Sequence, residues 1–226
     1  YSFNNDKKEI TIKKYNMPTP WMNYLSNGTF HTMMSQAGGG VAFYKSPQIW
    51  RINHYKFFHV PTDRSGFYSF IKDGNDYWCP TNEPCKSKPE KWAATHGMGY
   101  TKFEAEKNGV KAVSTYFVGE YENCLIWNIK LTSDTDKKIK VFPYVELGMM
   151  EFMRELQWQC YNKHQLSAYD MGDILVYKYG VEMQPKPDET PLVYFAVNKP
   201  IKGFDCDRDE FIGAYRSEEN PQNIEN

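Results

Sequence analysis

The sequence has 226 residues, of which 41% are apolar and 16% aromatic, and its formal net charge is −1. This length allows one large domain or two small ones with a proper core. A charge near zero provides no basic field for nucleic acid or for an acidic membrane surface. No apolar run approaches the length that spans a bilayer, and no signal peptide opens the chain. We therefore expect partners other than nucleic acid or a membrane.

The cysteines are odd in number and include no close Cys-x-x-Cys pair; they are Cys79, Cys85, Cys124, Cys160 and Cys206. This pattern argues against a zinc ribbon or a secreted disulfide framework, and it favours a reducing, cytoplasmic location. Cys79 and Cys85 are near enough in sequence to form a bridge, but two prolines lie between them. We expect free thiols.

In chain order, the first predicted elements are short strands separated by turn residues. They are a strand at 10–12, an aromatic strand at 19–25, a turn at 26–28 and strands at 30–34 and 41–44. Gly38, Gly39 and Gly40 precede the last of these. Such a run is expected where the chain turns sharply or where something approaches the main chain closely. A phosphate-binding loop would need a helix start and a Lys-Ser/Thr pair after the glycines, and Val-Ala-Phe-Tyr supplies neither.

The middle of the chain continues as strands. Alternating basic and aromatic residues predict one at 49–60, and others are expected at 67–71, 77–78, 92–95, 99–106, 110–118, 123–132 and 138–147. Asn108-Gly109 is the strongest hairpin signal in the sequence. Alternate positions predict apolar faces, one at Val113, Thr115 and Phe117 and one at Leu125, Trp127, Ile129 and Leu131.

The last part of the chain contains the one ambiguous stretch, 148–160, which is compatible with a helical turn. Strands are predicted at 174–179, 192–197 and 211–216, with a loop at 185–191. There is no internal repeat and no low-complexity tract. Many short strands with regular turns predict an all-β protein, a large antiparallel β-sandwich occupying residues 1–226 as one domain.

The residues themselves show little catalytic chemistry. There is no Gly-x-Ser-x-Gly, His-Glu-x-x-His or P-loop. His54 and His59 are either a metal-binding pair or ordinary strand histidines. Glu146 and Glu151 are either a carboxylate pair for glycoside chemistry or residues that end a strand. His96 is expected to hydrogen-bond a turn.

A series of motifs follows in a fixed order with hardly a gap. They are Thr19-Pro-Trp-Met-Asn-Tyr-Leu, Gly38-Gly-Gly-Val-Ala-Phe-Tyr, Arg51-Ile, Pro61-Thr-Asp-Arg-Ser-Gly-Phe-Tyr, Asp76-Tyr-Trp-Cys-Pro, His96-Gly-Met-Gly-Tyr-Thr-Lys-Phe, Thr115-Tyr-Phe-Val, Ile126-Trp, Phe142-Pro-Tyr-Val-Glu-Leu and Phe211-Ile-Gly-Ala-Tyr-Arg-Ser-Glu-Glu-Asn-Pro. In this order they resemble the N-terminal domain of the cellobiose and chitobiose phosphorylases, glycoside hydrolase family 94.

The resemblance implies a supersandwich of the galactose mutarotase-like kind, followed in family members by an (α/α)6 barrel that this chain does not contain. Members are cytosolic homodimers and inverting phosphorylases. Inorganic phosphate, the co-substrate, attacks the anomeric carbon of a β-linked disaccharide, giving an α-sugar 1-phosphate and a free sugar. The implied partners are therefore the disaccharide, phosphate, a helical catalytic domain of the same protein and a second copy. No other cofactor, no metal and no catalytic residue is expected here, because the general acid lies in the barrel.

One family motif that touches substrate falls within this chain. In the cellobiose phosphorylases, a loop after the Tyr-Val-Glu-Phe strand carries Phe-Gln-Arg, whose Arg reaches the acceptor sugar in the +1 subsite. The matching stretch is Trp158-Gln159-Cys160. We therefore expect Gln159 and Cys160 as substrate-binding residues. Because a thiol is a much weaker donor than a guanidinium, we also expect an acceptor or linkage other than 4-linked glucose.

Two other readings of the chain remain open. The segment at Gln159 and Cys160 is alternatively a structural loop. The whole domain is alternatively a non-catalytic carbohydrate-binding β-sandwich or a purely structural interaction domain.

Overall fold

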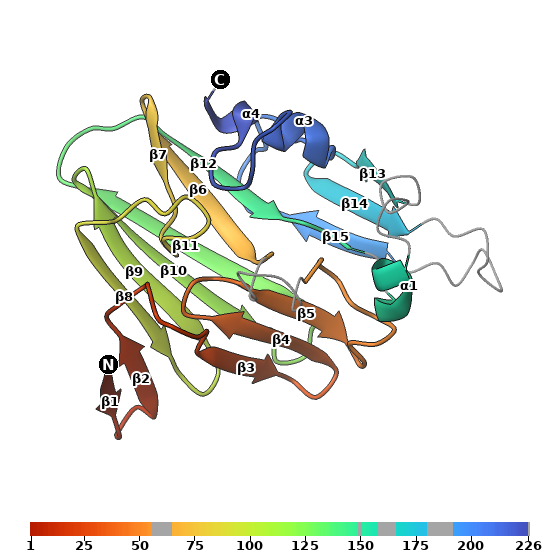
Figure 1. Cartoon of the computed structure of the whole chain (residues 1–226), viewed down its shortest axis with the longest axis horizontal. Coiled ribbons are helices and arrows are strands. Elements are labelled where there is room, and N and C mark those ends of the chain that lie inside the picture. Colours follow the sequence, from red (N-terminus) through yellow and green to blue (C-terminus); the bar gives the residue numbers. More distant parts are fainter. Residues whose placement is uncertain (56–64, 149–150, 158–165, 180–191, 226) are drawn as a thin grey trace.

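The computed structural model describes residues 1–55, 65–148, 151–157, 166–179 and 192–225. Strands predominate in this part of the chain (Figure 1). One sheet has six antiparallel strands in the order β1 (Ser2–Asn4), β2 (Glu9–Ile12), β8 (Lys91–His96), β9 (Thr101–Lys107), β10 (Val110–Val118) and β11 (Leu125–Ser133).

The remaining strands form three antiparallel sheets of three strands each. They are β3 (Met22–Ser26), β4 (Phe30–Ser35) and β5 (Gly40–Tyr44); β12 (Ile139–Val145), β6 (Phe67–Asp73) and β7 (Asp76–Trp78); and β13 (Leu166–Asp170), β14 (Ile174–Tyr179) and β15 (Leu192–Ala196). The described helices are short: α1 (Phe152–Gln157), α3 (Arg208–Ile212) and α4 (Gln222–Glu225).

The core lies between the six-stranded sheet and the sheets that contain β4, β5 and β6. Phe30, Met34 and Phe67 from one layer pack with Phe103 and Tyr116 from the other. A second cluster brings residues of β6 and β7 against β9 and β10. The predicted antiparallel β-sandwich is confirmed, because apolar faces of two layers are buried against each other.

The triple glycine marks a close approach of main chain to main chain. Gly39 forms a β-bridge with Gly66, and a Cβ on Gly66 would lie 2.1 Å from the carbonyl oxygen of Gly38. Gly40 has φ +154°, and a Cβ there would lie 1.9 Å from the carbonyl oxygen of Met33. The prediction of close approach is confirmed: the approaching main-chain groups are Gly66, directly before β6, and Met33 in β4.

The Asn-Gly hairpin is also confirmed. Asn108 and Gly109 have φ of 52° and 72° and join Lys107 to Val110, the paired ends of β9 and β10. Positive φ at both central residues is the geometry that matches the strand twist.

One predicted apolar face was wrong. In β10 the buried side chains are those of the opposite face: Val110, Ala112, Ser114 and Tyr116. The register explains this, because Tyr116 lies opposite Trp127 and Ala112 opposite Leu131, so the half-buried face of β11 continues onto that face of β10. The predicted β11 face is confirmed.

The strand predicted at 49–60 is replaced, in its described part, by two isolated bridges, Phe43↔Arg51 and Asn53↔Leu147. The side chain of Asn53 replaces some of the hydrogen bonds that a neighbouring strand would make: it accepts from the amide of Ala42 at 2.8 Å and donates to the carbonyl of Gly40 at 2.9 Å. Backbone groups that hydrogen-bond to a side chain do not need a partner on a neighbouring strand.

The strand predicted at 211–216 was wrong, because Phe211 lies in helix α3. Asp207 caps this helix by accepting from the amides of Asp209 and Glu210, and Gly213 ends it with φ 90°. An Asp cap and a terminal glycine are helix signals that override the aromatic, strand-like composition. The helical turn considered within 148–160 is confirmed as α1.

Candidate functional site

The substrate-binding residues predicted from the sequence, Gln159 and Cys160, lie outside the described residues. The structure does describe helix α1, which directly precedes them in the chain. It also describes the residues that hold α1 in place.

Helix α1 is anchored by a buried carboxylate. Glu155 is 3% exposed, and its Oε2 accepts a hydrogen bond from Nη2 of Arg51 at 2.5 Å. Its Oε1 also contacts Nδ1 of His54. The guanidinium of Arg51 also lies over the ring of Phe152, 5.1 Å from its centroid. A buried charge is tolerated only with a partner of opposite charge and good geometry, and Arg51 is that partner for Glu155.

Gly148 lies directly beside the Glu155 carboxylate. A Cβ on Gly148 would lie 2.8 Å from Oε2 of Glu155 and 2.9 Å from the main chain of His54. The carbonyl of Gly148 accepts from the hydroxyl of Tyr177 in β14 at 3.1 Å. Burial raises the pKa of Tyr177, so this hydroxyl stays protonated as a donor. Because Gly148 has no side chain, both the Glu155 carboxylate and Tyr177 of β14 can lie against it.

A second ionic group holds the C-terminal segment. Glu146 accepts from the Ser65 hydroxyl at 2.7 Å and from Nε of Arg208. Arg208 also donates to Glu218 at 2.8 Å. Burial alone would lower the pKa of Arg208, but Glu146, Tyr144 and Glu218 raise it, so this side chain is held as a cation.

The two groups are joined by backbone pairing. The amide of His54 donates to the carbonyl of Glu146 at 2.7 Å, and the amide of Gly148 donates to the carbonyl of Ile52 at 3.2 Å. We call the six residues Arg51, His54, Glu146, Glu155, Arg208 and Glu218 the ionic cluster. It connects β12 and the 51–54 segment with α1 and α3, which lie at one side of the sandwich (Figure 1).

The contacts of the ionic cluster indicate a structural role rather than a catalytic one. Glu146 accepts from Ser65 and Arg208, and Glu155 accepts from Arg51, so neither is presented as a free acid or base. Glu151, the other carboxylate considered for glycoside chemistry, directly precedes α1 and pairs with Arg154 of that helix at 2.8 Å. Among the described carboxylates of this region, the arrangement favours a structural role for Glu146 and Glu151 over a catalytic pair.

The histidines of the described segments also have structural partners. His96 contacts the Thr101 hydroxyl at 3.1 Å and the carbonyl of Trp21 at 2.9 Å. It therefore spans the 97–100 turn, as predicted. Within the described residues, no group of three or more metal-binding side chains lies together. His59, the proposed partner of His54 in a metal pair, lies outside them.

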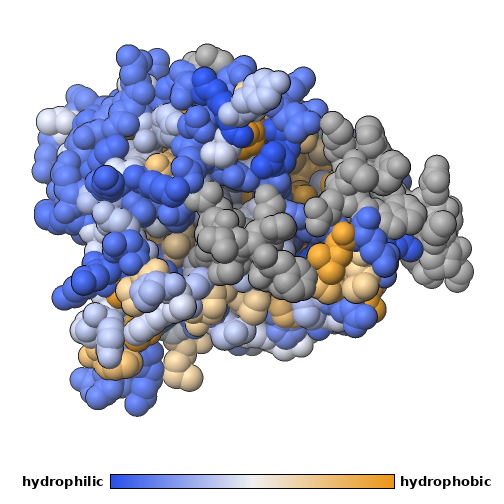
Figure 2. Space-filling view, in the orientation of Figure 1, coloured by the Kyte–Doolittle hydropathy of each residue, from blue (hydrophilic) through white to orange (hydrophobic). Residues whose placement is uncertain are grey.

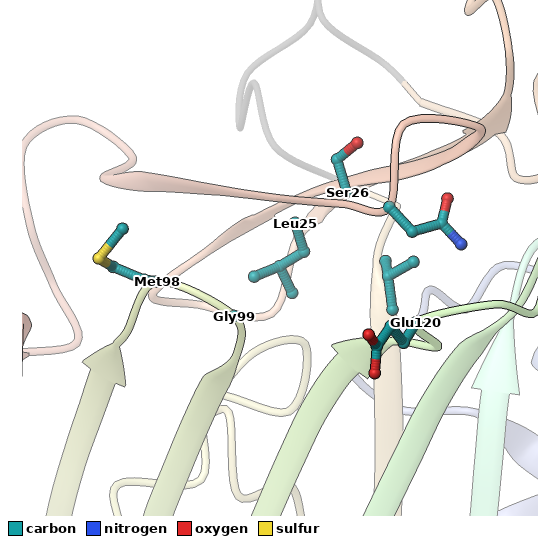
Figure 3. A pocket seen from close by; sticks show the side chains of 7 residues that line it. Leu25, Ser26, Met98, Gly99 and Glu120 are labelled. Atoms are coloured by element: carbon teal, nitrogen blue, oxygen red, sulfur yellow. The ribbon is translucent and has the colours of Figure 1, made fainter.

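An open hollow of about 310 Å³ lies elsewhere, where the β3–β4 turn meets the loops after β8 and β10. Figure 3 shows Leu25, Ser26, Met98, Gly99 and Glu120 around it. Two of its polar side chains are already used: the Asn27 amide donates to the carbonyls of Gly119 and Glu122, and the Ser26 hydroxyl contacts His31 at 2.8 Å. Such a hollow offers a ligand few convergent polar groups.

The face in Figure 2 is hydrophilic over most of its upper left part, and apolar side chains appear along its lower part. Of the helices that the structure describes, none has the length and apolar composition to cross a bilayer.

Comparison with known proteins identifies relatives over almost the entire chain. Residues 8–226 match the family described as glycosyl hydrolase 94, supersandwich domain. The N,N'-diacetylchitobiose phosphorylases of Vibrio proteolyticus and Vibrio furnissii are 34% and 31% identical over 99% of this chain. A solabiose phosphorylase of Paenibacillus borealis is 24% identical over 99% of the chain. The chain spans 28%, 28% and 29% of the length of these three relatives.

Proposed function

Because the chain belongs to glycoside hydrolase family 94, whose supersandwich domain it matches, we propose that it is the N-terminal domain of an inverting glycoside phosphorylase. The reaction is cleavage of a β-linked disaccharide by inorganic phosphate, giving an α-sugar 1-phosphate and a free sugar. The observation that carries this proposal is the match of 99% of the chain to two curated disaccharide phosphorylases at 34% and 31% identity.

The domain's part in this reaction is to support the acceptor side of the substrate site. The ionic cluster holds α1, and α1 leads into Gln159 and Cys160. The proposed role of the buried Glu155 pairs is to fix the start of that segment, because precise substrate geometry needs a rigid supporting shell. The catalytic acid and the phosphate site belong to a helical domain of the same protein. A cytoplasmic homodimer is part of the same proposal.

The substrate is the least determined part of the function. Relatives carry the names of N,N'-diacetylchitobiose, solabiose and 3-O-β-D-glucopyranosyl-β-D-glucuronide phosphorylases, so the family comprises several acceptors and linkages. The two relatives above 30% identity make N,N'-diacetylchitobiose the first disaccharide to test. Cys160 in place of the arginine of cellobiose phosphorylases argues against 4-linked glucose as the acceptor.

The test is phosphorolysis by the full-length protein. N,N'-diacetylchitobiose, cellobiose, laminaribiose, solabiose and cellobionic acid are each incubated with inorganic phosphate, and sugar 1-phosphate is measured. We expect release from at least one disaccharide, with the α-configuration of the product visible by NMR. Absence of phosphorolysis with saccharide binding retained would favour a carbohydrate-binding domain instead. Full activity on cellobiose alone would contradict the acceptor proposal.

A further inference from the structure

Two thiols lie against each other in the loop that follows β7. The Sγ atoms of Cys79 and Cys85 are 3.2 Å apart, and both cysteines are free. A disulfide has a sulfur–sulfur distance of about 2.05 Å, so closing this pair needs an approach of only about 1 Å. The loop between the two cysteines therefore already brings their sulfur atoms into contact.

Hydrogen bonds within the loop maintain this shape. The amide of Asn82 donates to the carbonyl of Cys79 at 2.9 Å, and the amide of Lys86 donates to the carbonyl of Asn82 at 2.8 Å. The amide of Lys88 donates to the side chain of Asn82 at 3.0 Å. These hydrogen bonds hold the loop in the conformation that places the two sulfur atoms side by side.

The two thiols differ in access. Cys79 is completely buried, in a cluster with Tyr68, Phe70 and Ile224, whereas Cys85 is half-buried at its edge. Burial and the contact with Cys85 raise the pKa of the Cys79 thiol. An external reagent thus reaches Cys85 first, and Cys79 is placed to attack the sulfur of Cys85 from the core side.

We propose that Cys79 and Cys85 form a reversible intramolecular disulfide by exchange with a low-molecular-weight disulfide such as glutathione disulfide. The Cys85 thiolate attacks one sulfur of glutathione disulfide, which forms a mixed disulfide and releases one glutathione thiolate. The Cys79 thiol then attacks Sγ of Cys85, the bond between Cys85 and glutathione breaks, and the Cys79 proton passes to the departing sulfur, which leaves as the second glutathione. In sum, two protein thiols are oxidised to one disulfide and one glutathione disulfide is reduced to two thiols.

The Cys79–Cys85 pair lies beside the 217–225 segment, the last part of the described chain. Lys86, directly after Cys85, pairs with Glu219 at 2.5 Å, and the hydroxyl of Tyr77 donates to the carbonyl of Glu219 at 3.4 Å. Drawing Cys85 toward Cys79 therefore fastens the loop close to the 217–225 segment. This places the redox-sensitive pair outside the ionic cluster and independent of the proposed phosphorylase chemistry.

The test is peptide mapping of the full-length protein after incubation with glutathione disulfide. Trypsin releases both cysteines in the single peptide 73–86, because no Lys or Arg lies between Lys72 and Lys86. We expect this peptide to become about 2 Da lighter than its dithiol form and to return to it with dithiothreitol. The peptides with Cys124 and Cys206 carry one cysteine each and are internal controls, which can only gain glutathione.

Two variants distinguish formation of the Cys79–Cys85 disulfide from addition of glutathione to a single cysteine. Cys85→Ser removes the accessible thiol, and its 73–86 peptide should neither lose mass nor gain glutathione. Cys79→Ser should retain glutathione on Cys85. If the buried Cys79 variant does not fold, Cys85→Ser alone keeps the test decisive. A wild-type peptide that stays dithiol, or that stops at the mixed disulfide while the Cys206 peptide is fully modified, would overturn the proposal.

Discussion

Glu155 in α1 and Arg51 after β5 form an ion pair in which both side chains are 4% exposed, with Nη2 and Oε2 2.5 Å apart. The two residues are far apart in the sequence, and Arg51 lies outside the regular strands. Their pairing is one of the contacts that connect α1 to the sandwich. Because α1 leads to the predicted acceptor-binding residues, this contact relates stability to the proposed activity.

Replacing Glu155 by Gln should be strongly destabilising, because it leaves the cation of Arg51 buried without a compensating charge. We expect a loss of about 3–5 kcal/mol in the free energy of unfolding, measured by urea denaturation. The matched control is Glu151→Gln, directly before the same helix. This carboxylate is 42% exposed, and its replacement should change stability by about 1 kcal/mol or less. Equal effects of the two variants would contradict the anchoring role of Glu155.

Gly66→Ala should be destabilising for a steric reason, because its Cβ would lie 2.1 Å from the carbonyl oxygen of Gly38. The backbone bridge to Gly39 would have to open. We expect a loss of at least about 2 kcal/mol in the same unfolding measurement. Gly99→Ala is the control, since nothing lies within 4 Å of its Cβ position. A stable Gly66 variant would show that the two strands can separate without cost.

The pH dependence of stability should carry a contribution from His96, because burial lowers the pKa of its imidazole below the usual value of 6.5. The unfolded chain then binds a proton more readily than the folded one, so stability is fully present above pH 6.5 and declines as the pH falls below it. Urea midpoints between pH 7.5 and 5 measure this decline. His96→Gln should flatten it in this range, whereas an unchanged slope would assign the decline to other groups.

The acceptor proposal predicts that Cys160→Arg shifts disaccharide preference in the full-length enzyme. A guanidinium fork donates several hydrogen bonds to sugar hydroxyls, whereas a thiol is a weak donor. We expect kcat/KM for cellobiose to rise about 10-fold relative to the preferred substrate, as one or two new hydrogen bonds would give. Cys206→Arg, at an exposed cysteine, is the control and should leave the ratio unchanged. An unchanged ratio in the Cys160 variant would support the structural reading of that loop.

Local chemistry was sufficient to predict most of the strands. The Asn108-Gly109 hairpin follows from backbone preference alone, and β10 (Val110–Val118) and β14 (Ile174–Tyr179) have the bounds expected from their composition. The helix at Arg208–Ile212 was missed because Phe211, Ile212 and the following Tyr215 favour a strand. Asp207 and Gly213 were the signals that would have identified it.

The candidate site was less accessible to prediction. His54 and Glu146 were considered in the sequence, but with partners other than those they have. Nothing in the local sequence identified Arg51, Glu155 and Arg208 as members of an ionic cluster, because a charged residue is expected to be exposed unless its three-dimensional surroundings are known. Only contacts between distant segments identify Glu155 as buried and paired.

The sequence by itself determined the β-sandwich class, its turns and the family resemblance, because strand periodicity, turn chemistry and motif order are properties of neighbouring residues. Tertiary structure alone decided which face of β10 is buried, why Gly66 and the triple glycine are needed, and how α1 is held. These depend on register and on the meeting of segments such as 51–54 and 146–148. Register and long-range contact follow from how the whole core packs, and no short stretch of sequence specifies that packing.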